Sequence, residues 1–205
     1  MPVDITAHNA LRLSALQTHL PAPPASPPGG AASAASITLH TTSTIPAHTF
    51  TACFELVAKN MMAMYKRSSM GWSAPAKRRE MMMPAMRFLV MSIPAGEDAE
   101  EEVLGFASFM VTQEEGEEVI YCYELQLAES VRGVGHGARL MQVLEGFGKN
   151  VGLAKAMLTV FAENTGAMRF YRRAGYDIDK ISPKPRVLRS GEVRDPSYYI
   201  FSKAI

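Results

Sequence analysis

Cysteine is scarce in this chain of 205 residues, which contains only Cys53 and Cys122. Two cysteines cannot build a disulfide framework or a cysteine-rich zinc site. Because Cys122 lies inside an apolar run, we expect a buried, reduced thiol there and a reducing compartment for the protein. No cluster of histidine, aspartate and glutamate has the spacing of metal ligands, so no metal is expected.

Long apolar runs and a basic N-terminus are also missing. No run approaches the ~20 residues that a membrane-spanning helix requires, so no membrane partner is expected. The N-terminus contains Asp4 and only Arg12 as a basic residue, which does not fit a signal or transit peptide. Four of the five histidines (His8, His19, His40 and His48) precede the motifs described below, so a hydrolase triad is not expected.

Charge is nearly balanced, at a net +1, but it is unevenly distributed. Residues 88–131 contain eleven Asp and Glu and no Lys or Arg, whereas residues 132–205 contain thirteen Lys and Arg and six Asp and Glu. The acidic middle suits a cationic substrate, and the basic C-terminal part suits a polyanionic cofactor. Solvated loops would also explain the acidic clusters, and we favour that interpretation for most of residues 97–102.

Proline and small residues divide the chain near residue 37. Residues 21–36 are almost entirely Pro, Ala, Ser and Gly, a composition typical of a linker. Residues 8–20 have leucines at a spacing that fits one short helix. We therefore predict an N-terminal extension with a linker over residues 1–36 and a single folded domain over residues 37–205.

Hydrophobic periodicity predicts a regular order of elements in that domain. The predicted elements are a strand at 36–44, helices at 48–67 and 75–83, strands at 86–93, 103–112 and 118–127, a helix ending near 151, a strand at 155–161, a helix at 165–174, and strands at 176–181 and 197–203. Gly116 between paired glutamates predicts a hairpin turn. The largely antiparallel first half passes into a βαβ unit from Leu125 through Phe161.

A glycine-rich loop stands at the crossover of this unit. Residues 131–137 read V-R-G-V-G-H-G, in which Arg132, Gly135 and Gly137 fit R-x-x-G-x-G between a strand and a helix. Glycines leave backbone N–H groups unobstructed at the positive end of the helix, an arrangement that suits a pyrophosphate. Glycine also serves ordinary turns, so the loop alone does not decide between the two.

The element order and this loop resemble the GNAT acetyltransferase superfamily. A second motif agrees, because residues 164–176 read N-x-x-A-x-x-F-Y-x-x-x-G-Y. The resemblance implies an α/β (α+β) fold with a mixed, twisted sheet of about seven strands flanked by about four helices, and acetyl-CoA as cosubstrate. The implied cofactor-binding residues are Leu125, Gln126, Leu127, Arg132, Gly133, Val134, Gly135, His136, Gly137, Ala138, Asn164, Ala167, Phe170 and Tyr171.

Within that superfamily the chain looks like the D-type N-terminal acetyltransferases (NatD), which acetylate the α-amine of histone four and histone two-A. The similar segments are N-M-M-A-M-Y (60–65), G-W (71–72), Y-C-Y-E-L-Q-L (121–127), M-L-T-V-F (157–161) and S-Y (197–198). The resemblance implies acetyl transfer to a Ser-Gly-Arg-Gly terminus by a monomer in the cytoplasm and nucleus. Histone tails are the implied partners, the ribosome is a further candidate, and no direct nucleic-acid contact is expected.

Glu124 is the candidate general base, because it is the only carboxylate in the apolar run from Val119 to Leu127. Partial burial would raise its pKa, and an α-amine, with a pKa near ~8, needs only a mild base. An ion pair or a glutamate facing a helix is the alternative interpretation. Strict alternation would place Tyr121 and Tyr123 on the opposite face. All three reach one cleft only if a bulge interrupts the strand, as GNAT folds have here.

Two further chemical roles are assigned to the same region. Tyr171 is a candidate to protonate the departing CoA thiolate, although a packing role fits its helical position equally well. Backbone N–H groups near Leu125 and Leu127 would polarise the thioester carbonyl. His136 is expected to act only through its backbone N–H. The candidate catalytic residues are therefore Glu124, Tyr123, Tyr121 and Tyr171.

The family pattern also implies a peptide-binding set, in which two positions differ here. The implied residues are Tyr65, Met70, Trp72, Glu114, Tyr121, Tyr123, Glu124 and Tyr198. Met70 stands where the family has a tryptophan, and Thr112 stands where it has an aspartate. Because a carboxylate can pair with a guanidinium through two hydrogen bonds, Glu114 is the predicted replacement that reads arginine at the third peptide position.

Two other functions remain open from the sequence. One is acetylation of lysine side chains or small amines, which needs stronger deprotonation because the pKa of lysine is near ~10.4. The other is a non-catalytic module that binds histone tails. The presence of Arg132, Gly135, Gly137 and Asn164 favours retained cofactor binding and therefore favours an enzyme.

Overall fold

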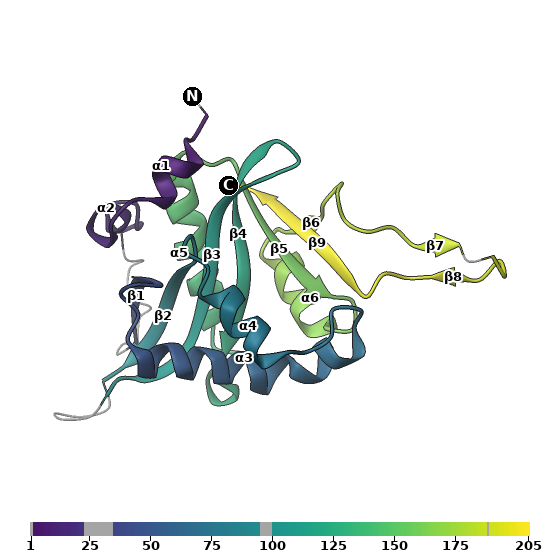
Figure 1. The fold of residues 1–205 in the computed structure, drawn as a ribbon, viewed down its shortest axis with the longest axis horizontal. Coiled ribbons are helices and arrows are strands. Elements are labelled where there is room, and N and C mark those ends of the chain that lie inside the picture. Colours follow the sequence, from purple (N-terminus) through teal and green to yellow (C-terminus); the bar gives the residue numbers. More distant parts are fainter. Residues whose placement is uncertain (1, 23–34, 95–99, 188) are drawn as a thin grey trace.

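Seven strands form one mixed sheet at the centre of the computed structural model, which describes residues 2–22, 35–94, 100–187 and 189–205 (Figure 1). In spatial order the strands are β1 (Ser36–Thr41), β2 (Arg87–Ile93), β3 (Glu102–Glu114), β4 (Glu117–Leu127), β5 (Lys155–Phe161), β9 (Tyr198–Ala204) and β6 (Asp177–Ile178). Neighbours are antiparallel except β4 and β5, which are parallel. The predicted mixed sheet of about seven strands is confirmed.

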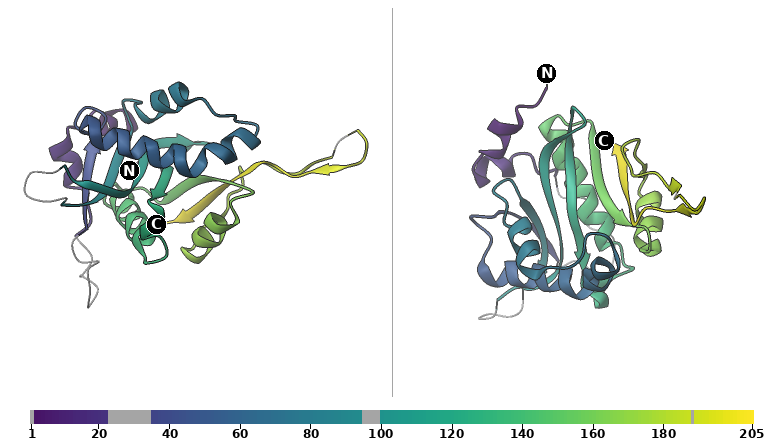
Figure 2. Two further views of the ribbon diagram at one scale, coloured as in Figure 1. Left: turned by 90° about the horizontal axis from the view of Figure 1, so that it is seen from below. Right: turned by 45° about the vertical axis from the view of Figure 1, so that its right-hand side comes forward.

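Two pairs of helices cover the two faces of the sheet. Helices α3 (Ala47–Arg67) and α4 (Ala74–Met81) lie on one face, and α5 (His136–Val151) and α6 (Thr165–Arg173) lie on the other (Figure 2). The start of α4 follows from its sequence, since the Ser73 side chain accepts a hydrogen bond from the N–H of Ala76 and Pro75 occupies the first turn. The result is a three-layer arrangement in which the sheet is apolar on both faces.

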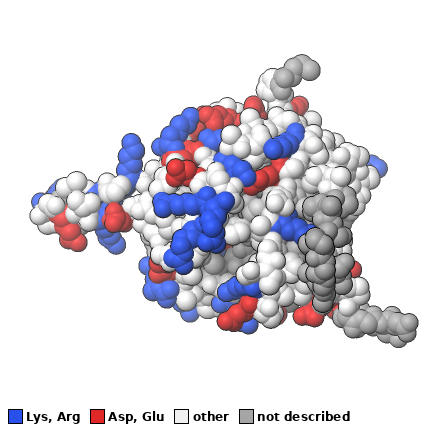
Figure 3. Space-filling view, turned by 180° about the vertical axis from the view of Figure 1, so that it is seen from behind, with Lys and Arg blue, Asp and Glu red and all other residues white. Residues whose placement is uncertain are grey.

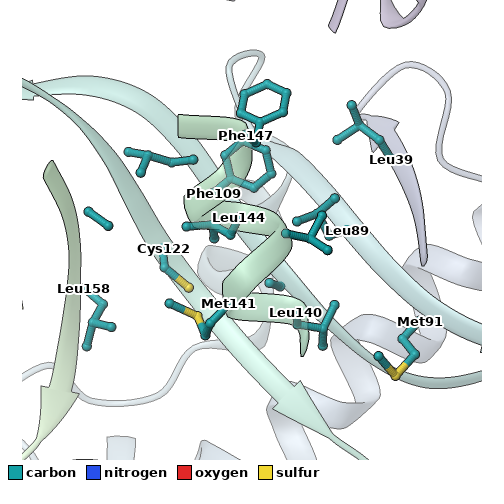
Figure 4. Packing of buried hydrophobic residues seen from close by; sticks show 14 of the residues in the cluster. Leu39, Leu89, Met91, Phe109, Cys122, Leu140, Met141, Leu144, Phe147 and Leu158 are labelled. Carbon is teal, nitrogen blue, oxygen red and sulfur yellow. The ribbon is translucent and has the colours of Figure 1, made fainter. Parts of the chain in front are cut away.

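Each face of the sheet has its own hydrophobic core. Under α5, Phe109 of β3 contacts Phe147, with ring centroids 5.1 Å apart, and both residues are fully buried (Figure 4). Under α3 and α4 lies a second cluster with Phe88 and Phe106 at its centre. The two clusters follow the alternation of the strands, because successive side chains point to opposite faces.

The N-terminal extension packs against the sheet domain. It forms two short helices, α1 (Ile5–Asn9) and α2 (Leu13–Gln17), so the single helix predicted at residues 8–20 is wrong. The chain turns between them because the Ala10 N–H bonds back to Thr6 and Ala7 and ends the first helix. Leu16 is fully buried in the core under α5, and the Asn9 amide donates to the Val111 carbonyl at 3.0 Å.

The C-terminal part differs most from the sequence expectation. The strand predicted at 176–181 is only two residues long, β6. The Asp179 N–H still donates to the Ile200 carbonyl of β9, but the chain turns directly afterwards, where the Asp179 side chain accepts the N–H of Ile181. A two-stranded hairpin that the periodicity did not predict, β7 (Arg186–Val187) and β8 (Val193–Arg194), projects away from the sheet (Figure 1). The first strand is also shorter than predicted, since it ends at Thr41 where a Thr41–Thr44 turn begins.

Candidate active site

The site lies where strands β4 and β5 separate. Their parallel ladder joins Ile120 to Ala156 and ends where Cys122 meets Leu158; beyond that point the described strands form no further pairs. Residues 123–127 of β4 therefore keep β3 as their partner on one edge and leave the other edge open. A strand edge without a neighbour presents free N–H and C=O groups, which is the setting that the sequence predicted for polarising a carbonyl.

A bulge at Tyr123 shapes the open part of β4. In the β3–β4 ladder Ser108 faces Glu124 and Phe109 faces Cys122, so Tyr123 is the extra residue. The predicted bulge is confirmed. It increases the local twist and brings Tyr121, Tyr123 and Glu124 to one cavity despite the alternation of the strand.

One large cavity, of about 1360 Å³, passes through the gap between β4 and β5. Its lining comes from both faces of the sheet. Helices α3 and α4 supply residues such as Tyr65 and Lys77 on one side, and the loop before α5 and helix α6 supply residues such as Gly135 and Phe170 on the other. A molecule could therefore enter from either face and meet another one in the middle.

The loop before α5 fits a bound polyanion. Gly133 and Gly135 have φ of +81° and +95°, which favour glycine, and a Cβ built at either would meet nothing within 4 Å. None of the described hydrogen bonds is donated by the N–H groups of residues 133–135. Because the first N–H groups of α5 also lack partners within the helix, several donors converge on this loop.

Most of the predicted cofactor residues line the cavity. The lining includes Leu125, Gln126, Leu127, Arg132, Gly133, Gly135, Gly137, Ala138, Asn164, Ala167, Phe170 and Tyr171. Val134 does not line it and is exposed, and His136 does not line it and is buried at the start of α5. Asn164 caps α6, because its side chain accepts the Ala167 N–H at 3.1 Å.

Basic residues gather on the α5 and α6 side. Figure 3 shows lysine and arginine side chains concentrated in the middle of the face opposite to that of Figure 1. Helix α6 contributes Arg169, Arg172 and Arg173, all exposed. The predicted match between the basic C-terminal part and a polyanionic cofactor is consistent with this distribution.

Glu124 is buried more completely than the sequence suggested, with only 5% of its surface exposed. Oε1 accepts from Lys77 Nζ at 3.0 Å, and Oε2 accepts from the Gln126 amide at 2.8 Å. Burial raises the pKa of Glu124, while Lys77 and Gln126 lower it, and the balance is upward. The ion pair that the sequence left as an alternative to a general-base role is therefore present. Its two residues, Glu124 and Lys77, both line the cavity.

Lys77 is the principal site residue that the sequence analysis missed. Its ammonium group also donates to the Tyr65 hydroxyl and to Glu80, both at 2.7 Å. Burial by itself would lower the pKa of Lys77, but Glu124 and Tyr65 raise it, and the direction is upward. The ammonium group therefore stays charged. Its sequence signal was its position four residues before buried Met81, on the inner face of α4.

Aromatic residues surround the α3 and α4 side of the cavity. Trp72 packs against Tyr65 with ring centroids 5.5 Å apart, and Tyr121 packs against Tyr123 at 5.4 Å, both pairs in a tilted arrangement. Burial raises the pKa of Tyr65 and of Tyr121 to about 12, so both stay neutral hydrogen-bonding groups at neutral pH. Of the predicted peptide-binding tyrosines, Tyr198 alone does not line the cavity.

Two further residues of the predicted peptide-binding set, Met70 and Glu114, also line the cavity. Met70 lines it and is 48% exposed. Glu114 lines it, whereas Glu115 and Glu118 do not, and Glu117 is bonded to Lys155 and Lys180. Among residues 114–118, Glu114 is therefore the only carboxylate that lines the cavity.

Tyr171 lies on α6 at the other side of Glu124. It lines the cavity, is 7% exposed, and none of the described hydrogen bonds involves its hydroxyl. Burial raises the pKa of Tyr171 well above its usual value. The hydroxyl therefore stays protonated and is able to donate a hydrogen bond.

The described residues contain neither a candidate metal site nor a candidate membrane-spanning helix. No group of three His, Cys, Asp or Glu there is placed to hold a metal ion. No described helix has the length and apolarity needed to cross a membrane.

The fold and the cavity agree with a comparison of the sequence with models of known protein families. Residues 57–176 match the model of the acetyltransferase (GNAT) family. The chain belongs to this family.

The individual proteins similar to this chain are acetyltransferases. N-alpha-acetyltransferase 40 of Saccharomyces cerevisiae is 31% identical over 186 residues, covering 73% of this chain and 62% of that protein. The chain thus spans less than two thirds of that relative's length. Two solved structures share the fold at low identity: Arabidopsis thaliana NAA60 in complex with a bisubstrate analogue (TM-score 0.57, 14% identity) and paiA N-acetyltransferase of Thermoplasma acidophilum in complex with coenzyme A (TM-score 0.55, 16%). Each alignment covers 83% of this chain and 99% of the other.

Proposed function

We propose that this protein is an N-alpha-acetyltransferase, which moves the acetyl group of acetyl-CoA to the free α-amine of a protein N-terminus. The supporting observation is Glu124, a buried carboxylate in the lining of a cavity that also includes the glycine loop before α5 and the aromatic residues Tyr65, Trp72 and Tyr123. The yeast relative carries this activity in its name.

Acetyl-CoA fits the α5 and α6 side. The open donors of residues 133–135 and the basic surface would hold the phosphates, and the cavity lining from Leu125 to Leu127 would receive the pantetheine arm along the free edge of β4. Acetyl-CoA supplies an acyl carbon that is already activated as a thioester. The protein therefore needs to orient two molecules and to handle protons.

The proton steps follow from the placement of Glu124 and Tyr171. As the amine nitrogen forms its bond to the acetyl carbon, the carbon–sulfur bond breaks and the amine loses one proton. Glu124 accepts that proton, directly or through a water molecule, and its raised pKa suits an α-amine with a pKa near ~8. Tyr171 is placed to donate a hydrogen bond to the departing CoA thiolate, since its raised pKa favours a hydrogen bond over complete proton transfer, and the thiolate takes up its proton from solvent.

Transfer is direct rather than through an acetylated cysteine. Cys122 is the one cysteine beside the cavity, and its thiol donates to the Glu124 carbonyl at 3.4 Å. Burial raises the pKa of Cys122, so the thiolate that a covalent route needs is not formed. Both substrates must therefore be bound together.

The substrate we propose is the Ser-Gly-Arg-Gly tail of histone four and histone two-A, as in the D-type enzymes. Tyr65, Trp72 and Tyr123 line the part of the cavity that would receive a short, small N-terminus, and Glu114 offers a carboxylate for the arginine that follows. We further propose a monomer that acts in the cytoplasm and nucleus, with the ribosome as a candidate partner.

Acetyl transfer to short peptides tests this proposal. Ser-Gly-Arg-Gly with a free α-amine should be acetylated, and the same peptide with a blocked α-amine should not. A peptide with a blocked terminus and one lysine provides the alternative acceptor. Acetylation of that lysine would favour a lysine acetyltransferase, and binding of the free peptide without any transfer would favour a non-catalytic tail-binding module.

A further inference from the structure

A chain of four polar side chains connects the glycine loop to Glu124. The Arg132 guanidinium donates to Asn60 Oδ1 at 2.6 Å. The Asn60 amide donates to Gln126 Oε1 at 3.0 Å, and the Gln126 amide donates to Glu124 Oε2 at 2.8 Å. The chain begins at an exposed residue on the loop and ends at two residues, Gln126 and Glu124, that are 6% and 5% exposed.

The direction of every bond in this chain is fixed by its ends. Arginine can only donate, so it must meet the oxygen of Asn60. The Asn60 nitrogen then faces Gln126 and also the Leu127 carbonyl, at 3.1 Å, which can only accept. Gln126 consequently turns its oxygen to Asn60 and its nitrogen to Glu124. Neither amide can flip without placing two donors or two acceptors face to face.

All dipoles therefore point the same way, with their positive ends toward the carboxylate. Aligned hydrogen bonds of this kind polarise one another and strengthen in a low-dielectric interior. They favour the charged form of the group at the end, which here is the form that accepts a proton. Asn60 is the central link, because it alone touches the loop, the end of β4 and Gln126.

We propose that Asn60 is a positioning residue for acetyl transfer, which holds Gln126 so that the Glu124 carboxylate stays ionised and oriented, and which connects that carboxylate to the cofactor loop through Arg132. This inference rests on the proposed function. Asn60 lies three residues after buried Val57 on α3 and lines the cavity, but its described hydrogen bonds join it to Arg132, Gln126 and the Leu127 carbonyl and not to Glu124 itself.

The first test removes the central link. Asn60→Ala leaves the Gln126 amide free to turn away, so Glu124 loses a donor. We expect kcat for the Ser-Gly-Arg-Gly peptide to fall about 10-fold while KM for the peptide changes less than twofold. The acidic limb of the pH profile of kcat/KM should move to higher pH by about half a unit or more. Asn150→Ala is the matched control. The one described hydrogen bond of the Asn150 amide nitrogen goes to the His19 carbonyl, and neither residue lines the cavity.

A second variant guards against misfolding. Asn60→Asp keeps the size of the side chain and the acceptor for Arg132 but cannot donate to Gln126. It should shift the pH profile in the same direction as Asn60→Ala. A loss of activity with an unchanged pH profile in both variants would overturn the proposal and leave Asn60 with a packing role.

A titration without substrate separates this inference from the proposed function. Carboxyl ¹³C NMR follows ionisation of Glu124 in the free protein, and Glu124→Gln identifies its signal. Asn60→Ala should raise the midpoint by about half a pH unit or more even if no peptide is ever acetylated. An unchanged Glu124 midpoint would contradict the inference, whereas a shifted midpoint in a protein that acetylates nothing would contradict only the function.

Discussion

Both halves of β4 carry buried side chains, but their neighbours differ. From Glu117 to Cys122 the strand pairs with β3 and, from Ile120 onward, also with β5, and its buried residues are apolar. From Tyr123 to Leu127 it pairs with β3 alone, and its buried positions are Glu124 and Gln126. One strand thus builds core where its ladder is complete and a polar site where the ladder stops.

The polar half is stabilised by pairing rather than by apolar contact. A buried charge is costly unless its partners compensate for the lost water. Lys77 and Gln126 provide that compensation for Glu124. The apolar half needs no such partners, so variants in the two halves should fail in different ways.

Breaking the ion pair should produce the largest effect. Lys77→Met leaves Glu124 buried without its counter-charge and should lower the free energy of unfolding by about 3–5 kcal/mol, measured by urea denaturation. Arg79→Met, on the exposed side of the same helix, should change it by less than about 0.5 kcal/mol. Adding Glu124→Gln to Lys77→Met should restore part of the loss. If the double variant is no more stable than the single one, the two charges are not coupled.

Removing the base should affect turnover more than stability. Glu124→Gln keeps the shape and should lower kcat by about 10²-fold. Because burial raises the pKa of Glu124, wild-type activity should fall as the pH drops through a value above the usual range of a glutamate. The acidic limb should disappear in the variant. Glu118→Gln, in the other half of β4, should keep full activity. A variant whose main defect is peptide affinity would show that Glu124 only positions the amine.

Substrate selectivity should depend on Glu114, at the far end of β3. Glu114→Ala should weaken binding of Ser-Gly-Arg-Gly by about 1–3 kcal/mol, the range for a charge-assisted hydrogen bond, and should barely affect Ser-Gly-Ala-Gly. Calorimetry on both peptides measures the difference, with Glu118→Ala as the control. Equal losses on the two peptides would indicate only a general field, and no loss on either would mean that this carboxylate does not read the arginine.

The smallest effect should come from the complete half of the strand. Ile120→Val removes one methylene from a fully buried side chain and should cost about 0.5–1.5 kcal/mol of stability, with kcat unchanged. Thermal unfolding and the peptide assay measure the two quantities. A clear fall in kcat would mean that the halves of β4 are not independent.

Periodicity predicted the elements that bury one regular face. Helix α3 and strand β5 agree with expectation to within one residue, since Phe50, Phe54 and Val57 repeat at helical spacing. The β7–β8 hairpin was not predictable in this way, because its residues are exposed and no apolar face marks them. Local hydrogen bonds also cut predicted strands short, as at Asp179.

The candidate site was predictable where a motif carried it and not where partners were distant. The glycine loop, the bulge and Glu124 followed from the motif and the strand. Lys77 and Asn60 did not, because their partners lie 47 and 66 residues away along the chain. The sequence did show a polar residue on the inner face of α3 and of α4. It could not show which residue each of them contacts.

The separation of β4 and β5 has a consequence for local opening of the chain. Three residue pairs are the whole direct ladder between the larger part of the sheet and the β5–β9–β6 part. A ligand held in the gap contacts both parts, so its binding free energy is added to their association. Those amides of residues 123–127 and 159–161 that point into the gap, rather than into the β3 and β9 ladders, should exchange hydrogen with solvent readily in the empty protein and slowly when the cosubstrate fills the gap.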